Sequence, residues 1–203
     1  MKLTISHILY PVYNLGPGSR IALWFQGCSI HCPGCLNPES WDFSGGRKIE
    51  LMEIYMAILE IAEDYAGISI SGGEPFDQYD ALVLLCSMLK ANTKLDILVF
   101  SGYDLPTLKS KHPDLHFLDV IDYLIDGPFV AENMAAEGLK GSANQCAYRF
   151  EAGLAIPIPD IESSKVCSVQ VTADHSAYLS GIPRQGEMDK LVKLLNNEGT
   201  TWR

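Results

Sequence analysis

The sequence predicts an α/β fold in which parallel strands are joined by crossover helices. Short apolar runs of strand length alternate with longer segments that have a helical apolar period, and short loops connect them. The chain has 203 residues, of which 47% are hydrophobic and 20% charged, as in ordinary globular proteins. This length suits one domain with a sizeable core. We therefore expect a single domain over residues 1–203.

The first half of the chain predicts two strands and a helix. Arg20–Phe25 is an apolar run that reads as a strand ending at a cysteine-rich loop. A helix is expected from about Ile49 to Tyr65. Its proposed apolar face carries Ile49, Met52, Met56 and Leu59. The next strand, Gly67–Ser71, is closed by the loop Gly72–Pro75.

The middle of the chain continues the alternation. Asp77 is a candidate N-cap for a helix over Tyr79–Ala91. A third strand is expected over Leu95–Phe100, a helix over Asp104–Lys111 and a fourth strand over Asp122–Ile125. These elements complete a strand–helix–strand pattern that is typical of parallel sheets.

The C-terminal part has a different pattern. Val166–Thr172 and Ala177–Gly181 predict two strands around residues 173–176, which would form a hairpin. A last helix is expected over Glu187–Asn197. The two strands would either form an add-on that packs against the sheet or be the last strands of the sheet itself.

Distinctive loops follow the first four of the predicted strands. They are Cys28–Cys35, Gly72–Pro75, Ser101–Tyr103 and Asp126–Phe129. Because the carboxyl ends of parallel strands lie at one edge of a sheet or barrel, where ligands bind, these loops are expected to meet. The sequence therefore places a candidate site beside the cysteines.

Cys28, Cys32 and Cys35 form a C-x3-C-x2-C motif. A [4Fe–4S] cube has four irons, and a protein usually supplies a thiolate to each. Three thiolates in one loop would leave the fourth iron open to an outside ligand, which favours catalysis over simple electron transfer. The motif therefore predicts an enzyme with an iron–sulfur cluster.

Two other interpretations of the cysteines stay open at this point. His31 would complete a Cys3His zinc set, although structural zinc sites usually draw their ligands from two separated loops. The cysteines could also be inert or linked by disulfides. Cys86 lies in an apolar helical run and is expected in the core, while Cys146 and Cys167 have no nearby cysteine partner.

The net charge and the first residues of the sequence indicate which partners and which cellular compartment to expect. The formal net charge is −10, and the absence of a basic stripe in the sequence argues against nucleic acid as a partner. No apolar run approaches the ~20 residues of a membrane span. Residues 1–7 lack the apolar stretch of a signal peptide, so we expect a cytoplasmic protein. In a reducing compartment, its six cysteines favour metal binding or catalysis over disulfides.

Several stretches, taken in order, resemble the radical S-adenosylmethionine superfamily. Within it the chain is most similar to the activating proteins of glycyl-radical enzymes, in particular the anaerobic ribonucleotide reductase activating type. The resemblance covers about residues 14–145. The stretches that carry it are Gly16-Pro17-Gly18-Ser19-Arg20, Trp24 to Cys28, Cys32 to Phe43, Ser71 to Pro75, Ser101-Gly102-Tyr103, Asp126 to Phe129 and Gly141 to Gln145.

The resemblance implies a fold and a chemistry. The fold would be a partial (β/α)6-type TIM barrel, with a strand and helix extension over about residues 150–203. Cys28, Cys32 and Cys35 would hold a [4Fe–4S] cluster whose fourth iron binds S-adenosylmethionine. Reductive cleavage would give methionine and a 5′-deoxyadenosyl radical, which abstracts a hydrogen atom from a glycine of a partner anaerobic reductase. A flavodoxin-like protein would donate the electron.

The resemblance also implies cofactor-binding residues. Gly72 and Gly73 would let the backbone approach the methionine ammonium, and Glu74 would add a carboxylate beside it. Ser101 would bind the cofactor carboxylate or ribose, and Asp126 would help to bind a cation next to the cofactor. For each of them a plain turn or capping role is the alternative.

Two regions leave their roles open. Asn144 and Gln145 would either reach substrate or cofactor, or form a structural loop network. The extension of over fifty residues resembles that of stand-alone relatives. An enzyme that modifies a small molecule or peptide without a protein partner is therefore the alternative function, and a structural zinc or redox module is a more distant one.

Overall fold

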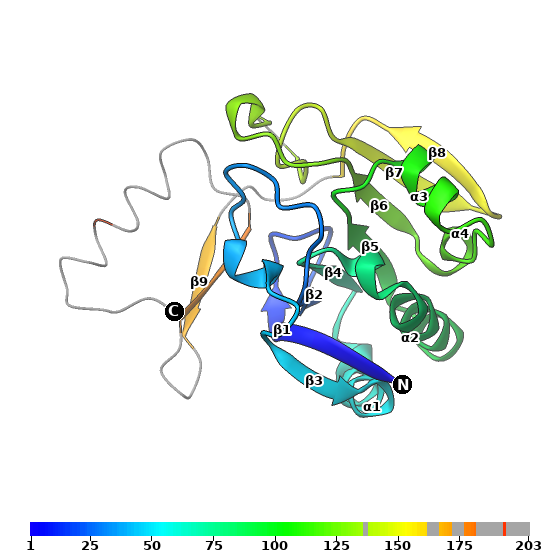
Figure 1. Ribbon diagram of the computed structural model, residues 1–203. Coiled ribbons are helices and arrows are strands. Elements are labelled where there is room, and N and C mark those ends of the chain that lie inside the picture. Colours follow the sequence, from blue (N-terminus) through cyan, green and yellow to red (C-terminus); the bar gives the residue numbers. More distant parts are fainter. Residues whose placement is uncertain (136–137, 162–166, 172–176, 182–192, 194–203) are drawn as a thin grey trace.

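The computed structural model describes residues 1–135, 138–161, 167–171, 177–181 and 193 (Figure 1). Its main sheet has eight strands in the order β3-β1-β2-β4-β5-β6-β7-β8, and β9 and β10 form a second sheet. The strands outside the parallel centre are β1 (Lys2–Val12), β3 (Arg47–Glu50), β7 (Cys146–Glu151), β8 (Leu154–Ile158), β9 (Ser168–Val171) and β10 (Ala177–Ser180). The predicted α/β class is confirmed.

Parallel strands form the centre of the main sheet. They are β2 (Arg20–Phe25), β4 (Gly67–Gly72), β5 (Asp96–Phe100) and β6 (Tyr123–Asp126), paired in that order. All four correspond to strands that the sequence predicted. On either side β1 and β7 pair antiparallel with this centre, so parallel pairing within the described residues stops at β2 and β6. The barrel of six parallel strands is not confirmed.

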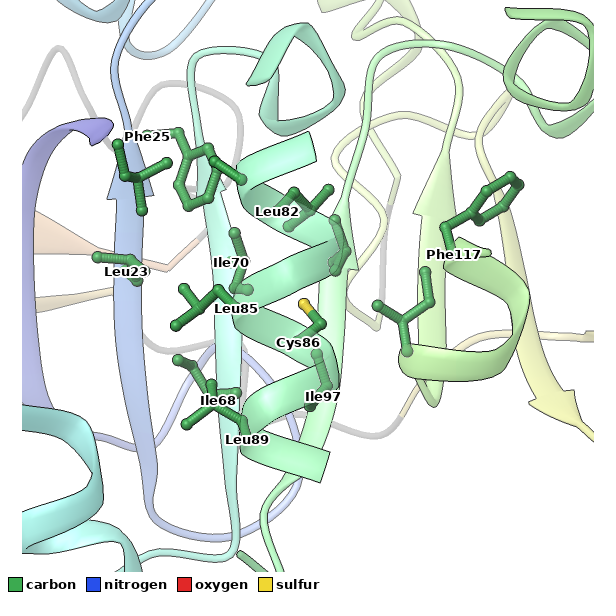
Figure 2. Packing of buried hydrophobic residues seen from close by; sticks show 14 of the residues in the cluster. Leu23, Phe25, Ile68, Ile70, Leu82, Leu85, Cys86, Leu89, Ile97 and Phe117 are labelled. Carbon is green, nitrogen blue, oxygen red and sulfur yellow. The ribbon is translucent and has the colours of Figure 1, made fainter. Parts of the chain in front are cut away.

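Within the described residues, four α-helices cover one face of the sheet. They are α1 (Leu51–Ile61), α2 (Tyr79–Asn92), α3 (Leu105–Lys111) and α4 (Phe117–Val120). Figure 2 shows α2 lying over the central strands, with Leu82, Leu85, Cys86 and Leu89 against side chains of β2, β4 and β5. Cys86 is fully buried, which confirms its predicted core position and raises the pKa of its thiol. Among the described residues, no helix has the length and apolarity that crossing a membrane requires.

The predicted start and face of the first long helix are wrong. Residues 47–50 pair with β1 as strand β3, so α1 begins at Leu51 instead of Ile49. Met52 and Met56 are 55% and 48% exposed. The side chains that α1 buries are Leu51, Ile54, Tyr55 and Ile58. This helix carries two apolar stripes of equal period, and periodicity alone cannot tell which one faces the sheet.

The predicted N-cap of α2 is also wrong. A 3₁₀ turn over Pro75–Gln78 precedes α2, and Gln78 occupies the cap position without a side-chain cap bond. Glu74 caps the 3₁₀ turn by accepting a hydrogen bond from Phe76 N. Asp77 points elsewhere because its carboxylate binds the cysteine loop. In α3, by contrast, Asp104 is the N-cap, as its side chain accepts a hydrogen bond from Thr107 N.

The described part of the C-terminal extension after β8 packs on the sheet face that the helices leave free. Ala22 and Trp24 alternate along β2 with the helix-facing residues, and Tyr178 of β10 packs against their cluster. Asn14 Nδ2 donates to Ser180 O at 2.9 Å. The two predicted C-terminal strands are therefore present as a separate antiparallel pair. Residues 172–176 and the predicted helix Glu187–Asn197 lie outside the described residues, apart from residue 193.

Arg20 joins the amino-terminal ends of three central strands. Its side chain is fully buried. Its Nε donates to Ser69 Oγ at 2.7 Å, and its Nη2 donates to Ile68 O at 3.0 Å and pairs with the Asp96 carboxylate. A Cβ on Gly67 would lie 2.5 Å from the guanidinium, so the glycine makes room for it. The arginine therefore holds β2, β4 and β5 in register.

We expect Arg20→Leu to lower the free energy of unfolding by about 3–5 kcal/mol, because the substitution leaves buried acceptors and the Asp96 carboxylate unpaired. Arg149→Leu is the matched control, since that arginine forms an exposed ion pair with Glu151. The control substitution should lower the free energy of unfolding by less than about 1 kcal/mol. Urea unfolding of both variants measures the difference, and equal losses would contradict the anchoring role of Arg20.

Candidate functional site

The loops that follow the four parallel strands meet and are joined by hydrogen bonds. Glu74 N donates to Gly27 O at 2.9 Å, which joins the glycine loop to the cysteine loop. Gly102 N donates to Glu74 Oε2 at 2.7 Å, and Gly127 N donates to Tyr103 O at 3.1 Å. The structure thus brings together the loops that the sequence analysis expected to converge.

Gly72 and Gly73 lie against the backbone of the cysteine loop and of β2. A Cβ on Gly72 would lie 2.3 Å from Phe25 O, and a Cβ on Gly73 would lie 2.1 Å from Gly27 O. Gly72 also has a φ of 109°, which disfavours residues with a side chain. The close approach to β2 at Gly72 and to the cysteine loop at Gly73 is by itself enough to require glycine at both positions.

Glu74 and Ser101 form a buried link between the loops after β4 and β5. Glu74 is 1% exposed, and its Oε1 accepts hydrogen bonds from Phe76 N and Ser101 Oγ, both at 3.0 Å. Ser101 Oγ also accepts a hydrogen bond from Tyr103 N at 3.1 Å. Burial raises the pKa of Glu74 to about 7, although these hydrogen bonds favour the carboxylate.

Asp126, the last residue of β6, links that strand to its neighbours. It is 2% exposed. Its carboxylate accepts hydrogen bonds from Leu105 N at the start of α3 and from Cys146 N, the latter at 3.2 Å. Burial raises the pKa of the carboxyl group. These contacts correspond to the capping alternative for Asp126, and a contact with a cation or cofactor stays a prediction.

Each sulfur of the motif faces at least one backbone amide. The amides of Ile30 and His31 face the Cys28 sulfur, and the amide of Phe129 faces that of Cys32. Asn37 N lies 3.4 Å from Cys35 Sγ. Such donors stabilise thiolates, although burial raises the pKa of the Cys28 and Cys32 thiols overall. The donor set therefore fits an iron–sulfur cluster.

The three thiols are free, and the loop places them at different depths. Cys28 is 8% exposed, whereas Cys32 and Cys35 are half-buried. Among the described residues, no three His, Cys, Asp or Glu side chains are grouped at metal-binding spacing. His31, the proposed fourth zinc ligand, stacks on Trp41 with ring centroids 4.7 Å apart. Trp24 and Phe25 are buried in the packing next to the loop.

Several residues that hold the cysteine loop carry no signal of this role in the sequence. Gln26 is buried, and its Nε2 donates to Glu39 O and Asp42 O at 2.9 and 2.8 Å. Gln78 Nε2 in turn donates to Gln26 O at 3.0 Å. Asp77, expected to cap a helix, binds Ser29. No local sequence pattern predicts these contacts, because the two residues of each contact lie in different segments of the chain.

Asn144 and Gln145 form a structural network between loops. Asn144 Nδ2 donates to Pro128 O at 2.8 Å. Gln145 Oε1 accepts a hydrogen bond from Gly141 N at 2.7 Å, and its Nε2 donates to Gly127 O at 2.8 Å. Of the two roles that the sequence left open, these bonds correspond to the structural one.

Comparison with known proteins identifies similar chains. Residues 14–148 match the family described as “4Fe-4S single cluster domain”. The anaerobic ribonucleoside-triphosphate reductase-activating protein of Vibrio cholerae is 35% identical over 153 residues, covering 71% of this chain and 97% of that protein. The Escherichia coli K12 protein of the same name is 32% identical over 152 residues, with the same shares. The pyruvate formate-lyase-activating enzyme of Clostridium pasteurianum is 32% identical over 114 residues, covering 52% of this chain and 47% of its own.

We expect Glu74 to make stability fall as the pH rises. Its folded pKa of about 7 exceeds the ordinary 4.5, so the stability that its proton adds is complete below pH 4.5 and is lost as the pH approaches 7. The loss should be on the order of 3 kcal/mol. Glu74→Gln should remove this part of the dependence of unfolding free energy on pH. Urea unfolding of the metal-free chain between pH 4.5 and 7 measures this dependence, and the same dependence in both proteins would contradict the assignment.

Proposed function

The chain belongs to the family of anaerobic ribonucleoside-triphosphate reductase-activating proteins, and on this basis we propose that it is a radical S-adenosylmethionine enzyme that activates a glycyl-radical partner. The observation that carries the proposal is the cysteine loop within the matched domain. It presents three free thiols, each facing a backbone amide, and it is bonded to the glycine loop after β4. This combination suits a cluster with one open iron.

We propose that Cys28, Cys32 and Cys35 hold a [4Fe–4S] cluster. When bound, the cluster supplies the electron that cleaves S-adenosylmethionine into methionine and a 5′-deoxyadenosyl radical, and the radical then takes a hydrogen atom from the substrate. The residues proposed to bind S-adenosylmethionine are Gly72, Gly73, Glu74, Ser101 and Asp126. Their support is their place in loops that contact the cysteine loop or one another.

The proposed partner is an anaerobic ribonucleotide reductase with a glycine as the site of hydrogen abstraction. The support is that the Vibrio cholerae and Escherichia coli relatives, 97% of whose length this chain covers, are anaerobic ribonucleoside-triphosphate reductase-activating proteins. A flavodoxin-like electron donor and a cytoplasmic location are parts of the same proposal. Hydrogen abstraction from a backbone glycine requires that a segment of the partner enters the site beside the cluster.

We also propose a finer description of the fold. The four parallel strands and their helices would be the central part of a partial (β/α)6-type barrel, supported by the ligand-bearing loops at their carboxyl ends. The whole chain would be one domain, with a core over about residues 14–145 and an extension over about 150–203. The packing of Tyr178 on the cluster of Ala22 and Trp24 supports a single unit.

The extension favours a second candidate function. It packs on the sheet face opposite the helices, and the alignment to the Vibrio cholerae relative covers only 71% of this chain. A layer outside the matched family domain suits an enzyme that shapes its own pocket for a small molecule or peptide. In that case the enzyme would turn over its substrate without a protein partner.

One anaerobic experiment tests the proposed function. The full chain is reconstituted with iron and sulfide and reduced with dithionite, and EPR is recorded before and after S-adenosylmethionine is added. We expect a [4Fe–4S]⁺ signal that shifts with the cofactor, together with 5′-deoxyadenosine in the same tube. An iron-poor protein that retains zinc and makes no 5′-deoxyadenosine would refute the proposed function and would indicate a structural metal site instead.

A second experiment, in which a partner reductase is added, distinguishes the two candidate functions. An anaerobic ribonucleotide reductase from the same organism is added to the reduced enzyme and S-adenosylmethionine. A glycyl-radical EPR signal on the reductase would support the activating role. Coupled turnover of a small substrate without any partner, and no glycyl radical in its presence, would support the stand-alone enzyme.

We expect replacement of Cys28, Cys32 or Cys35 by Ala to abolish cluster assembly and S-adenosylmethionine cleavage, because each thiolate is one of only three protein ligands. Cys146→Ala is the matched control, since that cysteine is exposed and lies outside the motif. It should bind as much iron as the wild type, as should Cys86→Ala and Cys167→Ala. Iron and sulfide analysis after reconstitution measures the outcome, and full iron content in a motif triple variant would refute the assignment.

A further inference from the structure

Three side chains from three different loops meet beside the first cysteine of the motif. Asp77 Oδ2 accepts a hydrogen bond from Ser29 N at 2.7 Å, and its Oδ1 accepts one from Ser29 Oγ at 3.0 Å. Tyr103 OH donates to Asp77 Oδ1 at 3.0 Å and lies 2.6 Å from Ser29 Oγ. We call Asp77 and Tyr103, with the hydroxyl and amide of Ser29, the Asp77 bridge. It joins the loops after β2, β4 and β5.

The Asp77 bridge completes a clamp on one half of the cysteine loop. Gly27 N donates to Ser40 O at 2.8 Å and Cys28 N donates to Trp41 O at 3.2 Å. With Ser29 N bonded to Asp77, three successive amides from Gly27 to Ser29 are engaged outside their own segment. The first half of the motif is therefore fixed by tertiary hydrogen bonds.

The second half of the motif is held differently. Cys35 N donates to Cys32 O at 3.1 Å, a turn within the loop itself. Cys32 and Cys35 are half-buried, while Cys28 is 8% exposed. The Cys28 side of the loop is thus the more deeply buried one.

We propose that Asp77 and Tyr103 are positioning residues for Cys28. Their bonds to Ser29 hold the first cysteine of the motif against the glycine loop, while Cys32 and Cys35 lie in the more exposed half. The cluster to which this positioning applies rests on the proposed function, but the positioning itself concerns only residues of the chain. Because the bonds to Asp77 involve a charged acceptor, they are stronger than those between neutral groups.

The first test measures thiol accessibility in the metal-free full chain. The protein is chelated and reduced, then alkylated for increasing times under anaerobic conditions, and mass spectrometry follows Cys28, Cys32 and Cys35 separately. We expect Cys28 in the wild type to react more slowly than the other two. Tyr103→Phe should accelerate Cys28 roughly threefold and Asp77→Asn roughly fivefold or more, because lost hydrogen bonds favour local opening. Cys32 and Cys35 should change by less than about twofold.

Two variants serve as matched controls. Tyr79→Phe removes another tyrosine–aspartate hydrogen bond, which the structure places on Asp114. Asp80→Asn removes an exposed carboxylate three residues from Asp77, in the first turn of α2. Both should leave Cys28 alkylation unchanged. Tyr103→Phe is the deciding variant, because it alters no charge near the thiol, whereas the loss of the Asp77 charge also eases ionisation of Cys28.

The double variant adds a further check. Since Asp77 and Tyr103 act through one bridge, Asp77→Asn combined with Tyr103→Phe should accelerate Cys28 by less than the product of the single effects. Unchanged Cys28 alkylation in Tyr103→Phe would overturn the proposal. An equal rise at all three cysteines would also overturn it, since that result indicates general destabilisation.

The second test uses the reconstituted protein. If the bridge positions Cys28, Tyr103→Phe should slow iron uptake and raise the KM for S-adenosylmethionine severalfold, with a much smaller change in kcat. Equal uptake and equal KM in variant and wild type would contradict the proposal. A wild-type protein that takes up no cluster would refute the proposed function, while the alkylation pattern would still decide the role of the bridge.

Discussion

The close approach of two backbones is the constraint on which the site depends. Strands β2 and β4 pair in parallel up to Phe25 and Gly72, and the chain then continues as two loops in contact. Gly73 lies so close to Gly27 O that any side chain there would overlap it. This contact sets where Cys28 emerges, and it leaves Glu74 buried at the junction with the loop after β5. A substitution at Gly73 would therefore displace the cysteine loop as well as the glycine loop.

The parallel centre could be predicted because each of its strands is a short apolar run closed by glycine or polar residues. The flanking strands could not. In β1 the register shifts between Ile5 and His7, which breaks the alternation that marks a strand. Strand β3 over Arg47–Glu50 is polar and exposed, and only its pairing with β1 makes it a strand. For the same reason, the start of α1 was placed two residues early.

In the candidate site, too, some residues could be predicted from the sequence and others could not. The cysteines could be predicted because metal ligands carry their chemistry and their spacing in the sequence. The residues that hold the loop could not, because Gln78 and Gln26 are 52 positions apart and Asp77 and Ser29 are 48 apart. Glu74 lies between these cases. Its position in the glycine loop was predicted, but its hydrogen bonds from Ser101 and Gly102 give the carboxylate a bracing role that no pattern shows.

The extension lies outside the part of the chain that carries the proposed chemistry. The loops that carry the proposed cluster and cofactor residues lie within residues 14–148, the part of the chain that matches the family. Tyr178 lies beyond that part, and it stacks near His7, which in turn stacks on Trp24, four residues before Cys28. The described part of the extension thus reaches the sheet face that carries Trp24, close in sequence to the cysteine loop. Under the alternative proposal of a stand-alone enzyme, a different substrate would therefore be accommodated by the extension rather than by the four loops.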